Sequence, residues 1–449
     1  MESIGGQREG ETQSLRQVIA ASFIGTTIEW YDFFLYGSAA ALVFGQLFFP
    51  YADPLVGTLA SFGIYGVGFI ARPVGGVIFG HYGDKVGRKA MLVISLMMMG
   101  IATFLIGLLP TADTIGIWAP VLLVVLRTVQ GLGVGGEWGG AVLLAVEHSP
   151  EGRRGFYGSW PQMGVPAGLL LANAVLLPMA SLLPQEQFLS WGWRVPFLAS
   201  IILIGVGLFV RLRIMESPAF RQVQESHTQA QMPIVDVVRH HPRNVLLAMG
   251  MRIAENGIFY ILTVFVLDYV TRELGLSRST ALLGVIIAAA VGLFTTPAFG
   301  ALSDRVGRRP VYMFGAVFSL IFSFPFFLLL DTRASVLIWL AISVGLWLGH
   351  DPMYGPQAAY FSELFGTRLR YSGASIGYQL ASIVGGGISP LIATSLLALG
   401  GGHWWLIALY MAGLSLITIV STYLASETYQ EDITSERPEE RRAVAGEPG

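Results

Sequence analysis

Long apolar runs alternate with short polar or glycine- and proline-rich breaks along almost the whole chain. A helix that crosses the hydrocarbon core of a bilayer needs about 20 apolar residues. Strand-length segments in which apolar and polar residues alternate, as an α/β protein requires, are not evident. The pattern therefore predicts an all-α membrane protein with twelve transmembrane helices, near residues 17–45, 55–79, 90–109, 117–146, 156–182, 193–213, 244–271, 281–302, 310–330, 335–361, 372–398 and 404–425.

The composition agrees with a membrane protein. Of 449 residues, 53% are hydrophobic and only 12% are charged, whereas a soluble domain carries roughly 25% charged residues. A net charge of −2 gives no field that would attract nucleic acid. The absence of cysteine excludes disulfides, thiolate metal sites and cysteine nucleophiles. We therefore expect a protein that is not an enzyme, binds no nucleic acid and holds no metal or other cofactor.

The basic residues predict how the chain is oriented. The first 16 residues are polar and no small-residue cleavage site follows the first span, so we expect this span to be retained. With both termini inside, twenty of the 27 Lys and Arg residues are cytoplasmic and four lie outside, in agreement with the positive-inside rule. The other three, Arg72, Arg127 and Arg252, fall inside spans. We expect a multi-pass protein of the plasma (inner) membrane with both termini in the cytoplasm.

Two turns that lie six spans apart carry nearly the same sequence. Residues 80–89 follow the second span and residues 300–309 follow the eighth, and both read Gly-x-x-x-Asp-[Lys/Arg]-x-Gly-Arg-[Lys/Arg]. Acidic and basic residues also recur after spans four and ten. Such turns either set topology alone or form a gate, and their recurrence at matched positions favours a cytoplasmic gate. Its candidate residues are Asp84, Arg88, Glu147, Arg153, Asp304, Arg308, Glu363 and Arg370.

The same repeat predicts the domain organisation. Parallel repeats are typical of two-bundle transporters whose site lies between the halves. We expect the chain to form a monomer. Its parts are expected to be a cytoplasmic segment (1–16), a six-helix bundle (17–213), a polar cytoplasmic linker (214–243), a second six-helix bundle (244–425) and a disordered cytoplasmic tail (426–449).

Span one carries two carboxylates on one helix face. Glu29 and Asp32 are three residues apart. Two close carboxylates do not both ionise easily in a poorly solvated cavity, so one of them is expected to hold a proton near neutral pH. A proton-coupled carrier needs such a group. In the alternative interpretation, this face lies in a wet vestibule and only supports packing.

Span four combines charged and small residues. At 100° per residue, Gln130 and Glu137 fall within one arc of roughly 80° that also contains Arg127. Arg127 either clamps a substrate carboxylate through its bidentate fork or forms a buried pair with Glu137 or Asp32. Beside this arc runs a small-residue stripe that lets a neighbouring helix approach closely: Gly131, Gly135 and Gly139.

Further ionisable groups lie in spans seven and ten. Arg252, Glu255 and Asn256 have the spacing i, i+3 and i+4. Arg252 either faces the cavity or extends to the lipid headgroups. The candidate substrate-binding residues of the whole chain are Arg127, Gln130, Arg252, Glu255, Asn256, Tyr260, Asp351 and Tyr354.

The paired turns resemble the signature loop of the major facilitator superfamily, and both copies fit it in full. Further blocks resemble the metabolite:proton symporter family within it: Glu29-Trp30-Tyr31-Asp32-Phe33, Arg127-x-x-Gln130-Gly131, and Gly135-Gly136-Glu137-Trp138-Gly139-Gly140. The resemblance extends from about residue 16 to residue 425, and spans one to six look most like the shikimate-type members. It implies transport of a metabolite such as α-ketoglutarate, citrate, shikimate, proline or glycine betaine, generally together with protons.

These observations predict a secondary active symporter for uptake of a small organic acid or betaine-like zwitterion by alternating access. The proton is the coupling ion, and its candidate carriers are Glu29, Asp32 and Glu137. The expected partners are a small-molecule substrate and the lipid bilayer. The alternative is a proton-driven efflux antiporter of the same fold. Antiporters of this kind carry a Gly- and Pro-rich block in span five, which residues 164–168 approximate only loosely.

Overall fold

The computed structural model describes the chain in several segments. Within them the secondary structure is helical, with no strand. The predictions for Glu137, Glu147 and Arg370 lie outside the described residues, and those for Asp84 and Arg88 lie outside the described side chains. The described residues are 2–86, 88–135, 142, 145–146, 149–150, 152–213, 242–365 and 377–430.

Each predicted span coincides with a helix in its described part, and the all-α fold is confirmed. The first helix begins earlier than expected, at Glu2. The first half contains α1 (Glu2–Ala39), η1 (Ala40–Phe44), α2 (Gly45–Phe48), α3 (Pro54–Val86), α4 (Arg88–Leu108), α5 (Ala112–Ile115), α6 (Trp118–Val134), α8 (Arg154–Leu182), α9 (Gln185–Gln187), η2 (Phe188–Gly192) and α10 (Arg194–Arg213), where η marks a π-helical turn.

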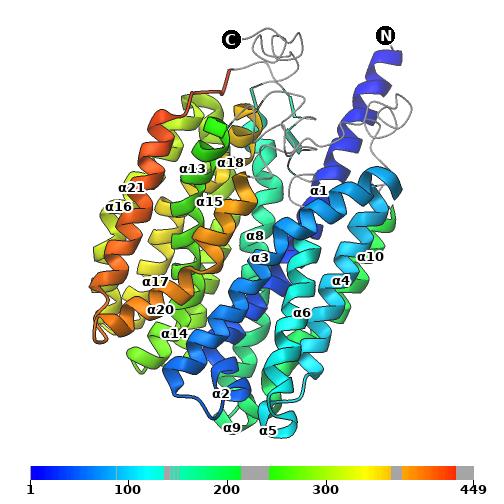
Figure 1. The fold of residues 1–449 in the computed structure, drawn as a ribbon. Coiled ribbons are helices and arrows are strands. Elements are labelled where there is room, and N and C mark those ends of the chain that lie inside the picture. Colours follow the sequence, from blue (N-terminus) through cyan, green and yellow to red (C-terminus); the bar gives the residue numbers. More distant parts are fainter. Residues whose placement is uncertain are drawn as a thin grey trace.

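The second half has the same plan. It contains α13 (Pro242–Tyr260), η3 (Ile261–Phe265), α14 (Val266–Asp268), η4 (Tyr269–Glu273), α15 (Arg278–Val306), α16 (Arg308–Asp331), α17 (Ser335–Val344), η5 (Gly345–His350), α18 (Asp351–Leu364), η6 (Ser382–Gly387), α20 (Ser389–Leu399) and α21 (Trp405–Leu424). The helices of the two halves form two groups that stand side by side (Figure 1), with α8 and α15 in contact where the groups meet.

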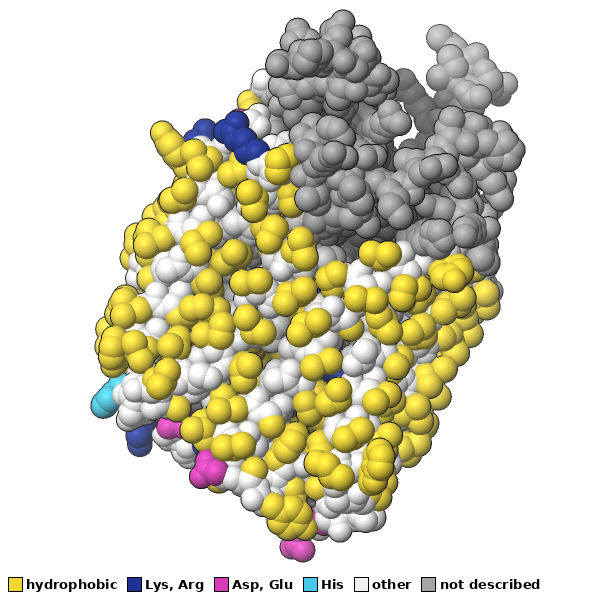
Figure 2. Space-filling view, in the orientation of Figure 1, with side chains coloured by type: hydrophobic (Ala, Val, Ile, Leu, Met, Phe, Trp, Pro, Cys, Tyr) yellow, Lys and Arg dark blue, Asp and Glu magenta, His cyan; other side chains and the backbone are white. Residues whose placement is uncertain are grey.

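The outer surface fits a lipid environment. Hydrophobic side chains cover the visible face of the molecule, whereas charged side chains gather at its two ends (Figure 2). Phe294 and Ile321 are each at least two-thirds exposed, as lipid-facing side chains are. In the part of the chain that the structure describes, nine helices are long and apolar enough to cross a bilayer, and two shorter apolar helices accompany them.

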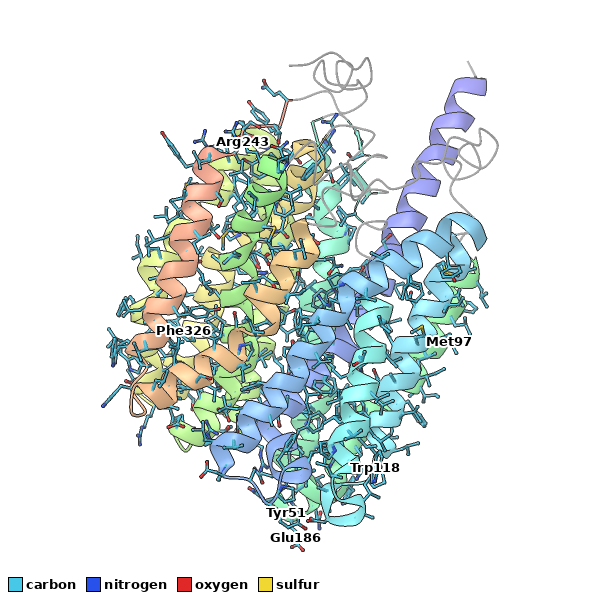
Figure 3. The ribbon with its side chains drawn as sticks, viewed as in Figure 1. Tyr51, Met97, Trp118, Glu186, Arg243 and Phe326 are labelled. Atoms are coloured by element: carbon cyan, nitrogen blue, oxygen red, sulfur yellow. The ribbon has the colours of Figure 1, made fainter. Side chains whose placement is uncertain are left out.

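The chain termini and loops identify the two ends of the molecule. The N-terminus, the end of α21 and Arg243 lie at one end, which we call the termini end (Figures 1 and 3). Tyr51 and Glu186 lie at the other, which we call the opposite end (Figure 3).

Glycines bring α3 and α6 into direct backbone contact. A Cβ atom on Gly75 would overlap the carbonyl oxygen of Leu132, and one on Gly131 would overlap that of Gly68. A Cβ on Gly135 would overlap the carbonyl oxygen of Arg72. The predicted small-residue stripe therefore has α3 as its neighbour, and this contact fixes the backbone that carries Arg72.

Adding one methyl group at this contact is expected to destabilise the protein. Gly75→Ala forces the two backbones apart, because neither can yield as a flexible side chain would. We expect a loss of about 1–3 kcal/mol, measured as a lower melting temperature of the detergent-solubilised protein. Gly63→Ala, in the same helix, is the matched control because a Cβ there meets nothing within 4 Å. Equal melting temperatures of the two variants would contradict this packing.

Candidate functional site

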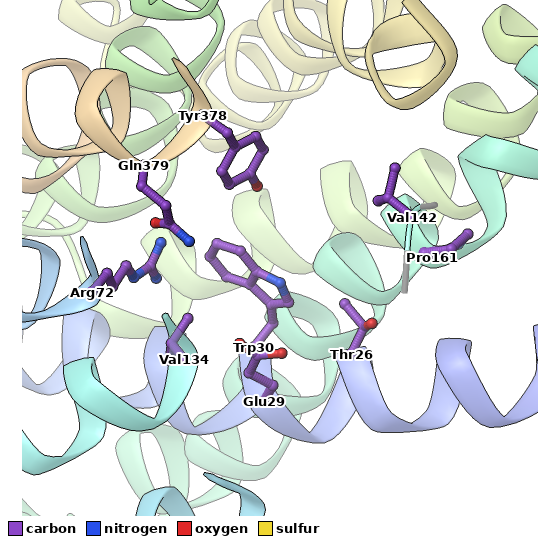
Figure 4. A pocket seen from close by; sticks show the side chains of 9 residues that line it. All are labelled: Thr26, Glu29, Trp30, Arg72, Val134, Val142, Pro161, Tyr378 and Gln379. Atoms are coloured by element: carbon purple, nitrogen blue, oxygen red, sulfur yellow. The ribbon is translucent and has the colours of Figure 1, made fainter. Parts of the chain in front are cut away.

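A small, nearly closed cavity lies between the two bundles. The first half contributes side chains from α1, α3, α6 and α8, and the second half contributes two neighbouring residues that precede η6 (Figure 4). Charged, amide and aromatic groups therefore meet in one place. The lining residues are Thr26, Glu29, Trp30, Arg72, Val134, Val142, Pro161, Tyr378 and Gln379.

Arg72 is the cation of this cavity. Its side chain is buried, and its guanidinium carbon lies 4.2 Å from the ring centre of Phe33 and 4.4 Å from that of Phe69. Its Nε and Nη2 atoms have no hydrogen-bond partner in the described structure. Among the described side chains, no carboxylate lies within salt-bridge distance of it. A buried cation whose described contacts are aromatic faces is a ready site for an anion.

Arg127 does not lie where a substrate clamp in this cavity would lie. It is fully buried and does not belong to the described lining of the cavity. Nη1 donates to Oε1 of Gln130 at 3.1 Å, and Nε and Nη2 approach the carbonyl oxygen of Tyr65 at 3.4 Å. Its guanidinium carbon lies 4.1 Å from the Phe33 ring centre. Two cations thus share the Phe33 ring, and Asp32 is not in an ion pair with either of them.

The carboxylates of α1 diverge. Glu29 lines the cavity and is nearly buried. Asp32 is buried outside the described lining, and its Oδ1 atom has no hydrogen-bond partner in the described structure. Glu29 and Arg72 therefore line the same cavity, whereas Asp32 is buried next to it.

A buried polar network occupies the second half. Arg252 Nη1 lies 2.7 Å from Glu255 Oε2 and donates to Gln357 Oε1 at 2.6 Å. Gln357 Nε2 donates to Glu255 Oε2 at 3.1 Å. The Arg252 guanidinium also lies 3.3 Å from the ring centre of Tyr378, which lines the cavity. Arg252 thus faces the protein interior rather than the headgroups.

The network continues into α18. His350 lies 3.1 Å from Glu255 and 2.9 Å from Asp351, and its ring stacks on Tyr354. The structure thus connects four of the predicted residues, Arg252, Glu255, Asp351 and Tyr354, through a histidine that sequence analysis did not select.

Aromatic rings close the space on the opposite-end side of the cavity. Tyr260 lies 6.4 Å or less, between ring centres, from Phe33, Phe34, Tyr65 and Phe69 of the first half. The Tyr260 hydroxyl and Oδ1 of Asn256 have no hydrogen-bond partner in the described structure.

Polar contacts close the termini end. Asp304, at the end of α15, accepts hydrogen bonds from the backbone N–H of Gly155 at 2.7 Å and of Phe156 at 2.8 Å, at the start of α8. A side chain of the second half therefore caps a helix of the first half. Gln162 Nε2 also approaches the Tyr354 carbonyl oxygen at 3.4 Å.

Arg308 joins this cap to a second carboxylate. It lies 2.7 Å from Asp304 and contacts Glu363 through two nitrogens, at 3.1 and 3.2 Å. Arg154 of the first half reaches Glu363 at 3.9 Å, while the neighbouring Arg153 is the N-cap residue of α8. Of the predicted gate residues, the structure brings together Asp304, Arg308 and Glu363, and we call these three the latch.

The segment after α21 packs against the latch. Glu427 accepts hydrogen bonds from the backbone N–H of Arg308 and of Arg309, both at 2.9 Å, and Thr428 donates to Glu363 at 2.8 Å. The tail was expected to be disordered from residue 426 onward, whereas Glu427 and Thr428 form these hydrogen bonds. A glutamate that caps α16 offsets the cost of ordering this short stretch.

Sequence analysis missed several site residues for physical reasons. Arg72 was recognised as a basic residue inside a span and as part of a family-like block, but it was not selected as a site residue. Gln357 carries no formal charge, so the cost of burying charge in a membrane did not mark it. His350 stands next to Asp351 at a spacing that places the two on different helix faces. Arg72 and His350 could have been found in the sequence, because each is a charged or titratable residue within an apolar run.

The two bundles, the cavity between them and the paired closures define a membrane transporter. Residues 22–390 match the family model described as Major Facilitator Superfamily, and residues 247–447 match it again. The chain belongs to the Major Facilitator Superfamily, in the group that contains the shikimate and proline/betaine transporters, and it is a transporter rather than an enzyme. The twelve-helix fold and the family resemblance are thereby confirmed.

Curated relatives cover nearly the full chain. It is 44% identical to the shikimate transporter of Escherichia coli K12, over 92% of this chain and 95% of that protein. It is 42% identical to the inner membrane metabolite transport protein YhjE of the same strain, over 94% and 96%. The proline/betaine transporter of E. coli K12 is 34% identical, over 94% and 86%.

Solved structures share the fold. The proton:xylose symporter XylE bound to 6-bromo-6-deoxy-D-glucose matches with a TM-score of 0.72, 17% identity, and coverage of 97% of this chain and 99% of that chain. A partially occluded inward-open form of XylE from E. coli matches with a TM-score of 0.70, 17% identity, and coverage of 94% and 100%.

Proposed function

We propose that this protein is a proton-coupled symporter that takes up a small organic acid or zwitterionic metabolite by alternating access. The observation that carries the proposal is the central cavity, in which a buried arginine has two donor nitrogens without a partner among the described residues, beside Glu29 and aromatic rings. Carboxylates are the ions that a guanidinium fork binds best. The similarity to the shikimate and proline/betaine transporters supports the same class of substrate.

In this proposal both termini lie in the cytoplasm of a cell with the protein in its plasma membrane. The excess of basic residues on the termini side supports this orientation. The latch then closes the cytoplasmic side, and the aromatic cluster around Tyr260 closes the outer side. Glu29, Asp32 and Glu137 remain proposed proton carriers, and Arg127 and Gln130 a proposed support for the substrate site.

Uptake into proteoliposomes tests the proposal. An outside-acid gradient of about one pH unit supplies about 1.4 kcal/mol per proton, which sustains about tenfold accumulation for one coupled proton. We expect radiolabelled shikimate, proline or glycine betaine to accumulate under this gradient, and a protonophore to abolish the accumulation. If the gradient accelerates none of the three and the protonophore has no effect, proton-coupled uptake of this class is wrong.

A further inference from the structure

His350 lies between two carboxylates that belong to different helices. Its Nδ1 atom is 2.9 Å from Asp351 Oδ1, and its Nε2 atom is 3.1 Å from Glu255 Oε1. The imidazole is nearly fully buried; it packs against the tilted ring of Phe259, 4.6 Å away between ring centres, and stacks on Tyr354 at 4.8 Å. Both ring nitrogens are therefore committed to carboxylate oxygens.

This arrangement requires a proton that a neutral imidazole and two carboxylates do not supply. Neutral imidazole donates through one nitrogen and accepts through the other, and an ionised carboxylate only accepts. Two N···O hydrogen bonds therefore need either an imidazolium or one protonated carboxyl group. The three groups form one coupled unit, so the proton belongs to the unit rather than to a single residue.

The charges of the neighbouring groups also require one extra proton on the unit. Arg252 pairs with Glu255, and Thr295 Oγ1 makes a hydrogen bond with Asp351 Oδ2. With one extra proton, the two carboxylates, Arg252 and His350 sum to zero charge, whereas without it they leave a net negative charge in a buried site. The other titratable groups that face it from the packed helices are Tyr312, Tyr354, Tyr378 and Tyr260.

We propose that Glu255, His350 and Asp351 form an exchangeable proton-binding site, and that its proton crosses the membrane with the substrate. This inference rests on the proposed function of proton-coupled symport. The site touches the cavity through Glu255, Arg252 and Tyr378, which are in consecutive contact. Substrate that displaces Tyr378 or draws on Arg252 changes the charge felt by Glu255, and hence the hold on the proton.

Release of the proton has a defined structural consequence. The unit gives H+ to a water molecule, and the remaining imidazole has one nitrogen without hydrogen that faces a carboxylate. That contact becomes repulsive and breaks. Glu255 lies on α13, whereas His350 ends η5. Loss of the contact between them therefore loosens the packing of these helices, and this movement can couple the loss of the proton to opening or closing of the gates.

Proteoliposomes distinguish this role from a structural one. With shikimate as the probe, His350→Gln is expected to reduce accumulation under an outside-acid gradient from about tenfold to about onefold. Counterflow, which exchanges labelled for unlabelled shikimate without net proton movement, is expected to stay within about twofold of the original rate. Counterflow of the unmodified protein should vary between about pH 5 and pH 8, and that of His350→Gln should not.

The controls separate the possible failures. His403→Gln is the matched control because His403 is exposed in the turn before α21, and its accumulation should remain unchanged. If the unmodified protein itself does not respond to the gradient, the proposed function fails. If it responds and His350→Gln accumulates shikimate equally well, the proton site is refuted. Should His350→Gln lose counterflow too, Asp351→Asn is measured in both assays: loss of accumulation alone supports the site, and equal loss of both overturns it.

Discussion

Replacing Arg72 by glutamine is expected to weaken uptake of an acidic substrate strongly while leaving the protein folded. The guanidinium is held by aromatic rings and lacks a described carboxylate partner, so its removal leaves no described carboxylate without a counter-ion. A hydrogen bond to a charged group contributes about 1.5–3 kcal/mol. We therefore expect about a 10- to 100-fold weaker apparent affinity for an acidic substrate, measured as the concentration dependence of shikimate uptake.

The chemistry of the substrate provides the sharpest control for Arg72. The unmodified protein is expected to prefer shikimate over its uncharged methyl ester, and Arg72→Gln should lose this preference. The preference of Arg72→Lys for the acid should lie between those of the unmodified protein and Arg72→Gln, because an ammonium keeps the charge but not the bidentate fork. Arg333→Gln, an exposed arginine in a loop, controls for net charge. An Arg72→Gln protein that still discriminates the acid from its ester would contradict the proposed clamp.

The sequence predicted the helices well because the bilayer itself imposes the signal. A span has to be about 20 residues long and apolar whichever helices surround it. The latch was predictable for a related reason, since the second turn recurs 220 residues after the first and places Asp304 and Arg308 four residues apart across a turn. The recurrence of charged residues after span ten had already indicated Glu363, and only its contact with Arg308 required the tertiary fold.

The choice between Arg72 and Arg127 shows where the sequence is insufficient. Both are single arginines within apolar runs, and each carries the same cost of burial. What separates them is that α3 presents Arg72 to the interface between the bundles, whereas Arg127 bonds to Gln130 and the Tyr65 backbone. The glycine contact between α3 and α6 sets this difference. That contact depends on which two helices pack together, and the spacing of residues within a single helix does not reveal this.

Removing the Asp304 side chain is expected to open the termini end. Its two oxygens accept charge-assisted hydrogen bonds from the first turn of α8, across the junction of the bundles. Loss of these bonds costs about 3 kcal/mol or more in the closed state and much less in the open state, where the groups are hydrated. The equilibrium between the states should therefore shift about 100-fold toward opening at this end. Net uptake should fall, because the carrier returns slowly to its outward-facing form.

Distances between spin labels measure that shift directly. The chain has no cysteine, so Tyr82→Cys with Val306→Cys labels the termini end of both halves, and Tyr51→Cys with His403→Cys labels the opposite end. In Asp304→Ala the first distance should lengthen and the second should not. Asp53→Ala is the matched control, since Asp53 caps the backbone N–H of Leu55 within its own bundle at 2.9 Å. If Asp304→Ala and Asp53→Ala give the same two distances, Asp304 does not hold the halves together, and the cap on α8 serves only the stability of that helix.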